Sequence, residues 1–187
     1  VAYRLLAREA VADCTSTEFT AASGLSRHDA RSWAKVETHS RESPFIPQIF
    51  GGIEDEMVET AKLLSKNADI IDLNFGCPAP KVTKTCAGAA MMGEPDNLVS
   101  MVERCIEASE VPISVKMRLG TGQGNITVLE IAERCAQLGV VRICVHGRTL
   151  SQKYRGVADW DLIRQVVEIT DPYGTPVIAT GDVHDAQ

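Results

Sequence analysis

Apolar residues follow two different patterns that alternate along this chain. Short runs rich in Ile and Val predict buried strands, and longer segments with an apolar residue at every third or fourth position predict helices. The expected strands cover residues 12–19, 44–52, 68–76, 111–120, 140–148 and 175–182. The expected helices cover residues 1–10, 54–66, 128–138 and 159–169, the last of which Asp159 could cap. Two more are expected, one that Ser26 could cap and one that starts at Pro95.

Strands that alternate with helices at this spacing form a parallel sheet, and near-continuous Ile and Val runs indicate strands covered on both faces. Polar side chains occur where five of the strands end: Gln48, Asn74 with Cys77, Lys116 with Arg118, His146 with Arg148, and Thr180 with Asp182. A shared rim of this kind favours a TIM (β/α)8 barrel over an open doubly wound sheet, which would gather such residues at one switch point. Because a complete barrel takes roughly 250 residues, we expect an incomplete barrel, holding about strands 2 to 7, from a longer chain.

Composition restricts the class of protein. The 187 residues, 44% of them hydrophobic, suffice for one domain and are too few for two, so residues 1–187 form one expected unit. The net charge of −6 argues against a uniformly basic nucleic-acid binder but permits a local basic patch. The six cysteines include no C-x-x-C pair and no zinc-like His spacing, which predicts no metal site and a reducing cytoplasm. No apolar run approaches the roughly 18 residues of a membrane span, so we expect a cytoplasmic protein without a membrane partner.

The segment Ile70–Ala90 carries the first candidate for chemistry. It leaves a predicted strand at Gly76-Cys77-Pro78, so the thiol of Cys77 lies on a shaped loop at a strand end. Lys81 and Lys84 follow and supply positive charge near the sulfur. A neutral thiol can donate a proton, and a thiolate can act as a nucleophile. The competing interpretation is an ordinary buried cysteine.

Three further strand ends offer polar groups to a ligand. Lys116 is flanked by apolar residues, where its charge could stabilise the electron-rich ring of a flavin or its amine could form a Schiff base. His146 follows an apolar strand and could hydrogen-bond a cofactor or substrate. Gln48 offers an amide that both donates and accepts towards a heterocycle. Each signal is weak singly, and their common position at strand ends is what suggests one site.

Cations gather in or near the loops at this rim. They are Lys81, Lys84, Arg118, Arg142, Arg148, Lys153 and Arg155, while many acids fall on the predicted helices. One interpretation is an ordinary solvated surface of mixed charge. The other is a cationic mouth on an acidic body, which suits a phosphate-bearing polymer, with Tyr154 able to stack a base.

The sequence also resembles a known family. The segment LNFGCPAPKVTKTCAGAA, together with QIFGG (48–52), VKMRLG (115–120), VHGRT (145–149) and Asp159-Trp160, is similar to the tRNA-dihydrouridine synthases. The resemblance implies an FMN enzyme on a TIM barrel that uses NADPH, or NADH, to reduce the C5–C6 double bond of particular uridines in tRNA. The segment PFIPQIFGG and the acidic composition suggest an archaeal source.

The resemblance implies roles for the site residues as well. Cys77 would protonate C5 of the uracil while reduced flavin delivers hydride to C6 from the opposite face. The isoalloxazine ring would be held by Gln48, Lys116 and His146, and the uracil would lie near Asn74 and Arg118. Among the rim cations, RNA contacts are expected from Lys81, Lys84 and Arg148.

One position departs from the family pattern. FMN contacts are expected from Thr180, Gly181 and Asp182, where the family usually has Asn in place of Thr180. The family's C-terminal helical tRNA-binding domain is expected to be absent from this chain, and which uridine is modified and the oligomeric state stay open.

Three other functions are compatible with the same residues. A flavin barrel related to dihydroorotate dehydrogenase would reduce a free pyrimidine and would need the cationic loops less. An aldolase would use Lys116 as a Schiff-base lysine without flavin. A barrel that binds tRNA without catalysis would leave Cys77 with no chemical role.

Overall fold

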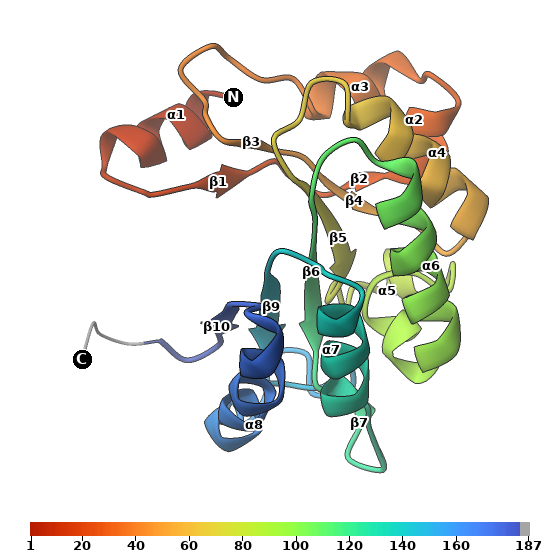
Figure 1. Cartoon of the computed structure of the whole chain (residues 1–187), viewed down its shortest axis with the longest axis vertical. Coiled ribbons are helices and arrows are strands. Elements are labelled where there is room, and N and C mark those ends of the chain that lie inside the picture. The colour runs from red at the N-terminus through yellow and green to blue at the C-terminus, as the bar shows by residue number, and fades with distance from the viewer. Residues whose placement is uncertain (184–187) are drawn as a thin grey trace.

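The computed structural model describes residues 1–183 and shows an α/β fold built on one parallel sheet (Figure 1). Its six strands, in spatial order, are β10 (Val177–Thr180), β9 (Ile143–His146), β6 (Ile113–Arg118), β5 (Ile71–Phe75), β4 (Gln48–Phe50) and β2 (Thr20–Ala21). At one end, β1 (Thr15–Ser16) pairs in parallel with β3 (Phe45–Ile46). This is the β/α arrangement of a TIM barrel, as the sequence predicted, and it does not close among residues 1–183.

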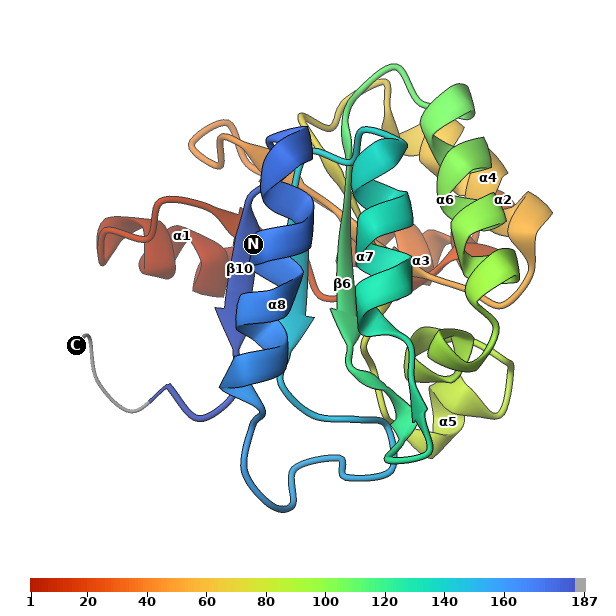
Figure 2. The ribbon, with the colours of Figure 1, turned by 60° about the horizontal axis from the view of Figure 1, so that its bottom comes forward.

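Helices cover one face of the sheet (Figure 2). Those that lie side by side in this layer are α4 (Glu54–Leu64), α6 (Pro95–Ala108), α7 (Val128–Gln137) and α8 (Trp160–Thr170). Helix α6 begins with proline, whose missing N–H would have no partner in the first turn anyway. Helix α8 begins at the predicted cap, because the side chain of Asp159 accepts the N–H of Leu162 at 2.9 Å.

The central strands present different residues to their two faces. Leu73, Val115 and Val145 are fully buried in the core beneath the helices. Their neighbours along the strands, among them Asp72 and Lys116, line a cavity on the opposite, inner face. Because side chains alternate along a strand, each central strand sends apolar residues to the helices and polar residues inward. The central strands β5 and β6 are buried on both faces, as expected, although the inner face is lined by polar side chains.

Pairing between strands brings the predicted strand ends together. In the parallel register, Asn74 lies opposite Lys116, and Arg118 lies opposite His146. His146 is in turn opposite Thr180 of β10. Figure 2 shows the arrowheads of β10 and β6 directed towards the same edge of the molecule. The rim inferred from the sequence therefore exists as one edge of the sheet.

The N-terminal third differs most from the expectation. Residues 12–19 contain one strand of two residues, β1, and β2 follows just after them. Residues 44–52 contain two short strands, and Pro47, which has no N–H to donate, separates β3 from β4. The predicted cap Ser26 is wrong, because Ser26 ends α2 (Ala22–Ser26). The helix that follows, α3 (Ala30–Lys35), is instead capped by Asp29, whose carboxylate accepts the N–H of Ser32 at 2.8 Å.

The remaining elements are short. They are α1 (Ala2–Glu9), α5 (Pro80–Thr83), the 3-10 helices η1 (Gly88–Gly93) and η2 (Asp171–Tyr173), and the antiparallel pair β7 (Gly120–Gly122) and β8 (Asn125–Ile126). Within residues 1–183, no helix has both the length and the apolar composition needed to cross a bilayer.

Candidate functional site

A cavity of about 240 Å³ opens at the carboxyl edge of the sheet. It is lined by Phe19, Gln48, Asn74, Gly76, Cys77, Pro78, Lys116, Arg118, His146 and Tyr154. These residues come from four strand ends and their loops, so six predicted site residues share one space: Gln48, Asn74, Cys77, Lys116, Arg118 and His146. The remaining predicted site residues lie around this space rather than in its wall.

The loop that carries Cys77 is held by hydrogen bonds on both of its edges. Where β5 ends, the side-chain oxygen of Asn74 accepts the N–H of Gly76 at 3.1 Å and that of Cys77 at 2.9 Å. The Nε of Arg118 donates to the carbonyl oxygen of Gly76 at 2.8 Å. On the far side, the N–H of Ala89 donates to the carbonyl oxygen of Cys77 at 3.0 Å. The backbone of Cys77 is therefore fixed before any ligand binds.

Apolar side chains surround Cys77 on the protein side. Cys77 is 9% exposed and packs in a small cluster with Val82 and Ala87, against which Phe19 and Phe50 also lie. The same residue lines the cavity that holds the amine of Lys116 and the imidazole of His146. The thiol therefore borders an apolar wall on one side and the polar cavity on the other, which suits a group that gives a proton to a bound substrate.

His146 is held in its neutral form. Burial, and then the positive charges of Arg118, Lys116 and Arg148, outweigh the opposing effect of Asp182 and lower the pKa of His146 to about 4. Its Nδ1 atom is buried and has no hydrogen-bond partner among residues 1–183. A buried ring nitrogen without a partner indicates a missing ligand or water.

Lys116 is the cation beside this histidine on the inner face. Its Nζ lies 3.4 Å from the sulfur of Cys144 and 3.3 Å from the hydroxyl oxygen of Thr180. It takes part in none of the ion pairs formed within residues 1–183. An unpaired lysine and a neutral imidazole with an open nitrogen fit an electron-rich ring with hydrogen-bonding edges, which is what a flavin presents. The residues present therefore fit FMN.

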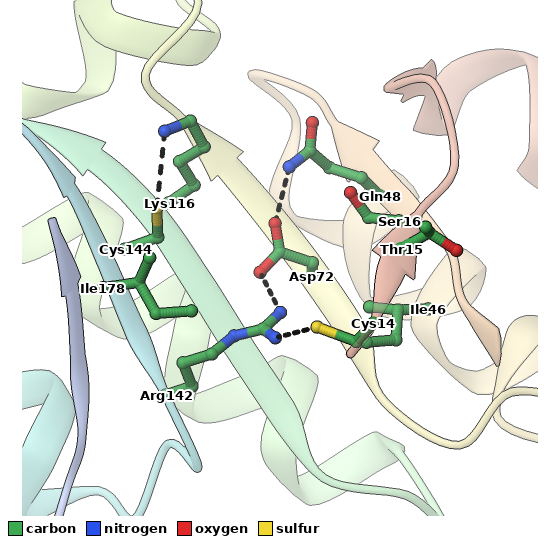
Figure 3. A pocket seen from close by; sticks show the side chains of 10 residues that line it. All are labelled: Cys14, Thr15, Ser16, Ile46, Gln48, Asp72, Lys116, Arg142, Cys144 and Ile178. Atoms are coloured by element: carbon green, nitrogen blue, oxygen red, sulfur yellow. Dashed lines mark hydrogen bonds and ion pairs between the residues drawn. The ribbon is translucent and has the colours of Figure 1, made fainter. Parts of the chain in front are cut away.

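A second cavity of about 170 Å³ lies deeper on the inner face (Figure 3). Gln48 and Lys116 line both cavities. In the deeper one, the carboxylate of Asp72 accepts from Nε2 of Gln48 at 2.6 Å and forms an ion pair with Arg142 at 3.6 Å. Asp72 was not among the predicted site residues, although its position two residues before Asn74 on a strand places both on one face.

Two of the predicted rim cations are buried. Arg118 is 2% exposed, and besides Gly76 its guanidinium binds the carbonyl oxygens of Thr149 and Lys153, at 3.0 and 2.8 Å. Arg148 is 5% exposed and places one terminal nitrogen 2.7 Å from each carboxylate oxygen of Asp182. Arg148 therefore ties two loops together, and its low exposure leaves little of it open to the RNA contact that was expected of it.

A third predicted rim cation lies at the other end of the sheet. Arg142 precedes β9 and faces Asp72, far along the strand from His146. The cations that are exposed at the rim are Lys81, Lys84, Lys153 and Arg155. Tyr154, 76% exposed, stands among them with the guanidinium carbon of Arg118 5.7 Å from its ring centre. The cationic mouth is therefore smaller than predicted and surrounds an aromatic ring.

The end of β10 contributes less to the cavity than expected. Thr180 accepts from Lys116 and donates to the carbonyl oxygen of Val145 at 3.2 Å. Asp182 binds Arg148 and the backbone N–H of Ala158, so its carboxylate closes a loop. A Cβ on Gly181 would lie 3.4 Å from Nε2 of His146, which makes this glycine part of the packing around the imidazole.

Comparison with known proteins agrees with this geometry. The family described as Dihydrouridine synthase (Dus) matches residues 1–187. The chain belongs to the dihydrouridine synthase family. Among curated relatives, it is 39% identical over 99% of its length to a probable tRNA-dihydrouridine synthase of Rhizobium leguminosarum bv. phaseoli. It is 36% identical over 98% of its length to that of Treponema pallidum, and 34% identical over 86% to tRNA-dihydrouridine synthase B of Pasteurella multocida.

The match covers only part of each relative. This dihydrouridine synthase chain spans 58%, 56% and 48% of the length of those three proteins. All three are bacterial, so they lend no support to an archaeal source. In the part of the chain that the structure describes, no group of three or more His, Cys, Asp or Glu side chains is placed to hold a metal ion.

Proposed function

We propose that this chain forms the flavin-binding and catalytic part of a tRNA-dihydrouridine synthase, which reduces the C5–C6 double bond of uridine in tRNA with FMN and NADPH or NADH. The observation that carries the proposal is the single cavity shared by Cys77, Lys116 and His146. A thiol, a cation and a neutral imidazole at one carboxyl edge form a site for a redox cofactor and a substrate that needs a proton. The family assignment favours this chemistry over a Schiff-base aldolase.

Lys116, His146 and Gln48 are the residues that would hold the cofactor. Reduced FMN, regenerated by the nicotinamide cofactor, would supply the hydride for C6 of the uracil. Lys116 brings a positive charge that takes part in no ion pair among residues 1–183, and His146 brings a neutral ring with an open Nδ1. The charge of Lys116 favours a ring that gains electron density, because it stabilises the reduced form. The open Nδ1 of His146 offers that ring a hydrogen-bond partner.

Cys77 would give the second hydrogen. As the C5–C6 π bond breaks, its electron pair takes the thiol proton at C5, the S–H bond breaks, and a thiolate remains that solvent reprotonates. The N–H of Cys77 donates to Oδ1 of Asn74 and its carbonyl oxygen accepts from Ala89, and these two hydrogen bonds keep the backbone of Cys77 in place during this transfer. Because a proton donor acts only within hydrogen-bond reach of its acceptor, this fixed loop matters as much as the acidity of the thiol.

A uridine must leave the base stack of tRNA to enter this cavity. The exposed cations at the rim, Lys81, Lys84, Lys153 and Arg155, are suited to bind phosphates on either side of the extruded nucleotide. A free pyrimidine has no phosphates and would gain nothing from them. These exposed cations are the feature that favours tRNA over a free base.

The test uses Cys77→Ala and Cys86→Ala in the full-length protein. Cys86 is exposed and does not line the cavity, so it is the matched control. The substrate is tRNA from a strain that lacks the gene. We expect Cys77→Ala to keep FMN and to lose most dihydrouridine formation. Cys86→Ala should retain both FMN and activity. Reduction of free uracil at rates similar to tRNA would instead support the free-pyrimidine function. Full activity of Cys77→Ala would contradict the proposed role of its thiol.

A further inference from the structure

A chain of one ion pair and several side-chain hydrogen bonds crosses the inner face of the sheet and ends at the Cys77 loop. Figure 3 shows its first part, from Arg142 through Asp72 to Gln48. It begins at Arg142, whose guanidinium lies 3.6 Å from the carboxylate of Asp72. Asp72 accepts from Nε2 of Gln48 at 2.6 Å, and Oε1 of Gln48 accepts from Nδ2 of Asn74 at 2.8 Å. Oδ1 of Asn74 then accepts the N–H of Cys77.

The guanidinium of Arg142 and the backbone N–H groups at the two ends of this chain can only donate. At one end stand the guanidinium of Arg142 and the hydroxyl of Ser114, which accepts from Arg142 at 3.3 Å and donates to Asp72. At the other end stand the backbone N–H groups of Gly76 and Cys77. A side-chain amide donates on one side and accepts on the other, whereas a carboxylate accepts on both sides. With a guanidinium at one end and N–H groups at the other, a chain of two amides is matched at every contact when one carboxylate lies between the ends.

We propose that Asp72 is this carboxylate and acts as a positioning residue for the reacting thiol. By accepting from both sides, it fixes which way the amides of Gln48 and Asn74 point, and through Asn74 it fixes the Cys77 loop. The inference rests on the proposed function only for its consequence in catalysis. The hydrogen-bond network itself stands independently of which substrate is reduced.

The place of the carboxylate within the chain has a second consequence. Gln48 lines the cavity that contains Cys77, whereas Asp72 lines only the deeper one. The negative charge is therefore kept away from the ligand, and neutral amides face it. Each amide uses one of its two N–H groups in the network, so Gln48 and Asn74 each present a second donor in a fixed direction.

The test moves the carboxylate from position 72 to position 48. Asp72→Asn removes the charge opposite Arg142 and leaves either a donor–donor contact within the chain or an amide N–H turned towards Ser114 and Arg142. Gln48→Glu alone leaves one acceptor–acceptor contact. The double variant Asp72→Asn/Gln48→Glu again has one carboxylate between the two donor ends, so every pair is matched. Full-length wild type and the three variants are compared without tRNA, by hydrogen–deuterium exchange of the Gly76 and Cys77 amides, and then by the rate of dihydrouridine formation.

We expect Asp72→Asn to exchange these two amides about tenfold faster than wild type, and the double variant to return to within about threefold of wild type. The rate of dihydrouridine formation should fall by about tenfold or more in Asp72→Asn, because a displaced thiol is a poor proton donor. The control is Asp69→Asn. Asp69, like Asp72, follows α4, but its carboxylate accepts the backbone N–H of Phe45 at 2.6 Å and is not part of the hydrogen-bond chain. Its exchange at Gly76 and Cys77 should match wild type.

Unchanged exchange in Asp72→Asn, or a double variant no better protected than the single one, would overturn the proposal. If Asp72→Asn does not fold, recovery of folding in the double variant supports the matched network, and failure of both overturns it. A protein that shows the expected exchange pattern but makes no dihydrouridine would refute the proposed function and leave the role of Asp72 standing.

Discussion

A Cβ atom placed on Gly88 would lie 2.8 Å from the carbonyl oxygen of Cys77 and 3.2 Å from its Cβ. Gly88 has a φ of +59°, which a residue with a side chain adopts only at a cost. It opens η1, and the next residue, Ala89, donates its N–H to the same carbonyl oxygen. The thiol-bearing residue is therefore packed directly against the first turn of η1, with no space for a side chain between them.

Gly88→Ala should displace the Cys77 loop. The added methyl group must move the backbone of Cys77 or the side chain of Val82, whose Cγ1 would lie 2.9 Å away. We expect a loss of stability of about 1–3 kcal/mol from the strained φ, measured by urea unfolding. The rate of dihydrouridine formation, measured where the variant is fully folded, should fall while FMN affinity changes little.

Gly174→Ala is the matched control for this prediction. Gly174 has a φ of +68°, and a Cβ there would meet no atom within 4 Å. It carries a similar backbone strain far from the cavity, so it should lose stability and keep its activity. Equal activity losses in the two variants would mean that Gly88 acts through global stability alone and not through Cys77.

The lowered pKa of His146 predicts a pH dependence of stability. The groups that face the imidazole are Arg118, Lys116 and Arg148, which oppose its protonation, and Asp182, which favours it. Because the pKa is about 4 in the folded protein and about 6.5 in an unfolded chain, only the unfolded chain takes up this proton between those values. The contribution to stability is therefore present above pH 6.5 and is lost as the pH falls towards 4.

Replacement of the imidazole should remove this dependence. In His146→Gln, the free energy of unfolding should fall less between pH 7 and pH 5 than in the wild type, as measured by urea unfolding at each pH. Titration of the ring by NMR should give a midpoint near 4 in the wild type. A midpoint close to 6.5 would show that the surroundings of the imidazole do not hold it neutral and would remove the argument from its lowered pKa.

Arg148 joins the end of β9 to the loop after β10 and is predicted to be structural. Besides Asp182, its guanidinium donates to the carbonyl oxygens of Arg155 and Gly156, at 3.2 and 2.7 Å. A lysine cannot reproduce this planar set of donors. Arg148→Lys should therefore destabilise the protein by roughly 2 kcal/mol, because it leaves part of a buried pair unmatched. Thermal and urea unfolding would measure the loss.

Arg134→Lys provides the comparison on the surface. Arg134 pairs with Asp96 at 2.8 Å and with Glu130 at 3.1 Å, and both carboxylates are largely exposed. Such pairs contribute little, so the change in stability should stay within about 0.5 kcal/mol. If Arg148→Lys is equally mild, the buried pair with Asp182 is not what holds the two loops.

The alternation of predicted strands and helices was sufficient to predict the parallel sheet, and the polar residues at the strand ends predicted the edge that carries the site. Asn74, Lys116 and His146 could be placed together because parallel strands end at one edge, whatever their loops do. Asp72 was missed because it lies within an apolar run. What distinguishes it from its apolar neighbours is that its side chain lies on the inner face of the sheet. A period of two had to be followed through each strand to find it.

The cations show why sequence position alone could not identify surface residues. Lys81 and Arg148 both follow a strand end, yet Lys81 is exposed and Arg148 is buried against Asp182. That difference depends on residues 155–158 and 182 folding back towards the end of β9, which is a long-range contact. Likewise, Asp29 rather than Ser26 caps α3 because Leu25 and its neighbours form a separate short helix first.

Lys81 and Lys84 are predicted to bind tRNA through its phosphates. Both are exposed, and they belong to or directly follow α5, the first element after Cys77. Lys81→Ala/Lys84→Ala should weaken tRNA binding and make it less dependent on salt, with a slope of log Kd against log salt reduced by about one to two. The double variant Lys62→Ala/Lys66→Ala removes the same charge where α4 leads into β5, at the opposite edge of the sheet. Its salt slope should equal that of the wild type, since those lysines are far from the cavity. Equal losses of tRNA affinity in both variants would mean that tRNA responds to the net charge of the protein. The rim beside Cys77 would then be no specific RNA contact.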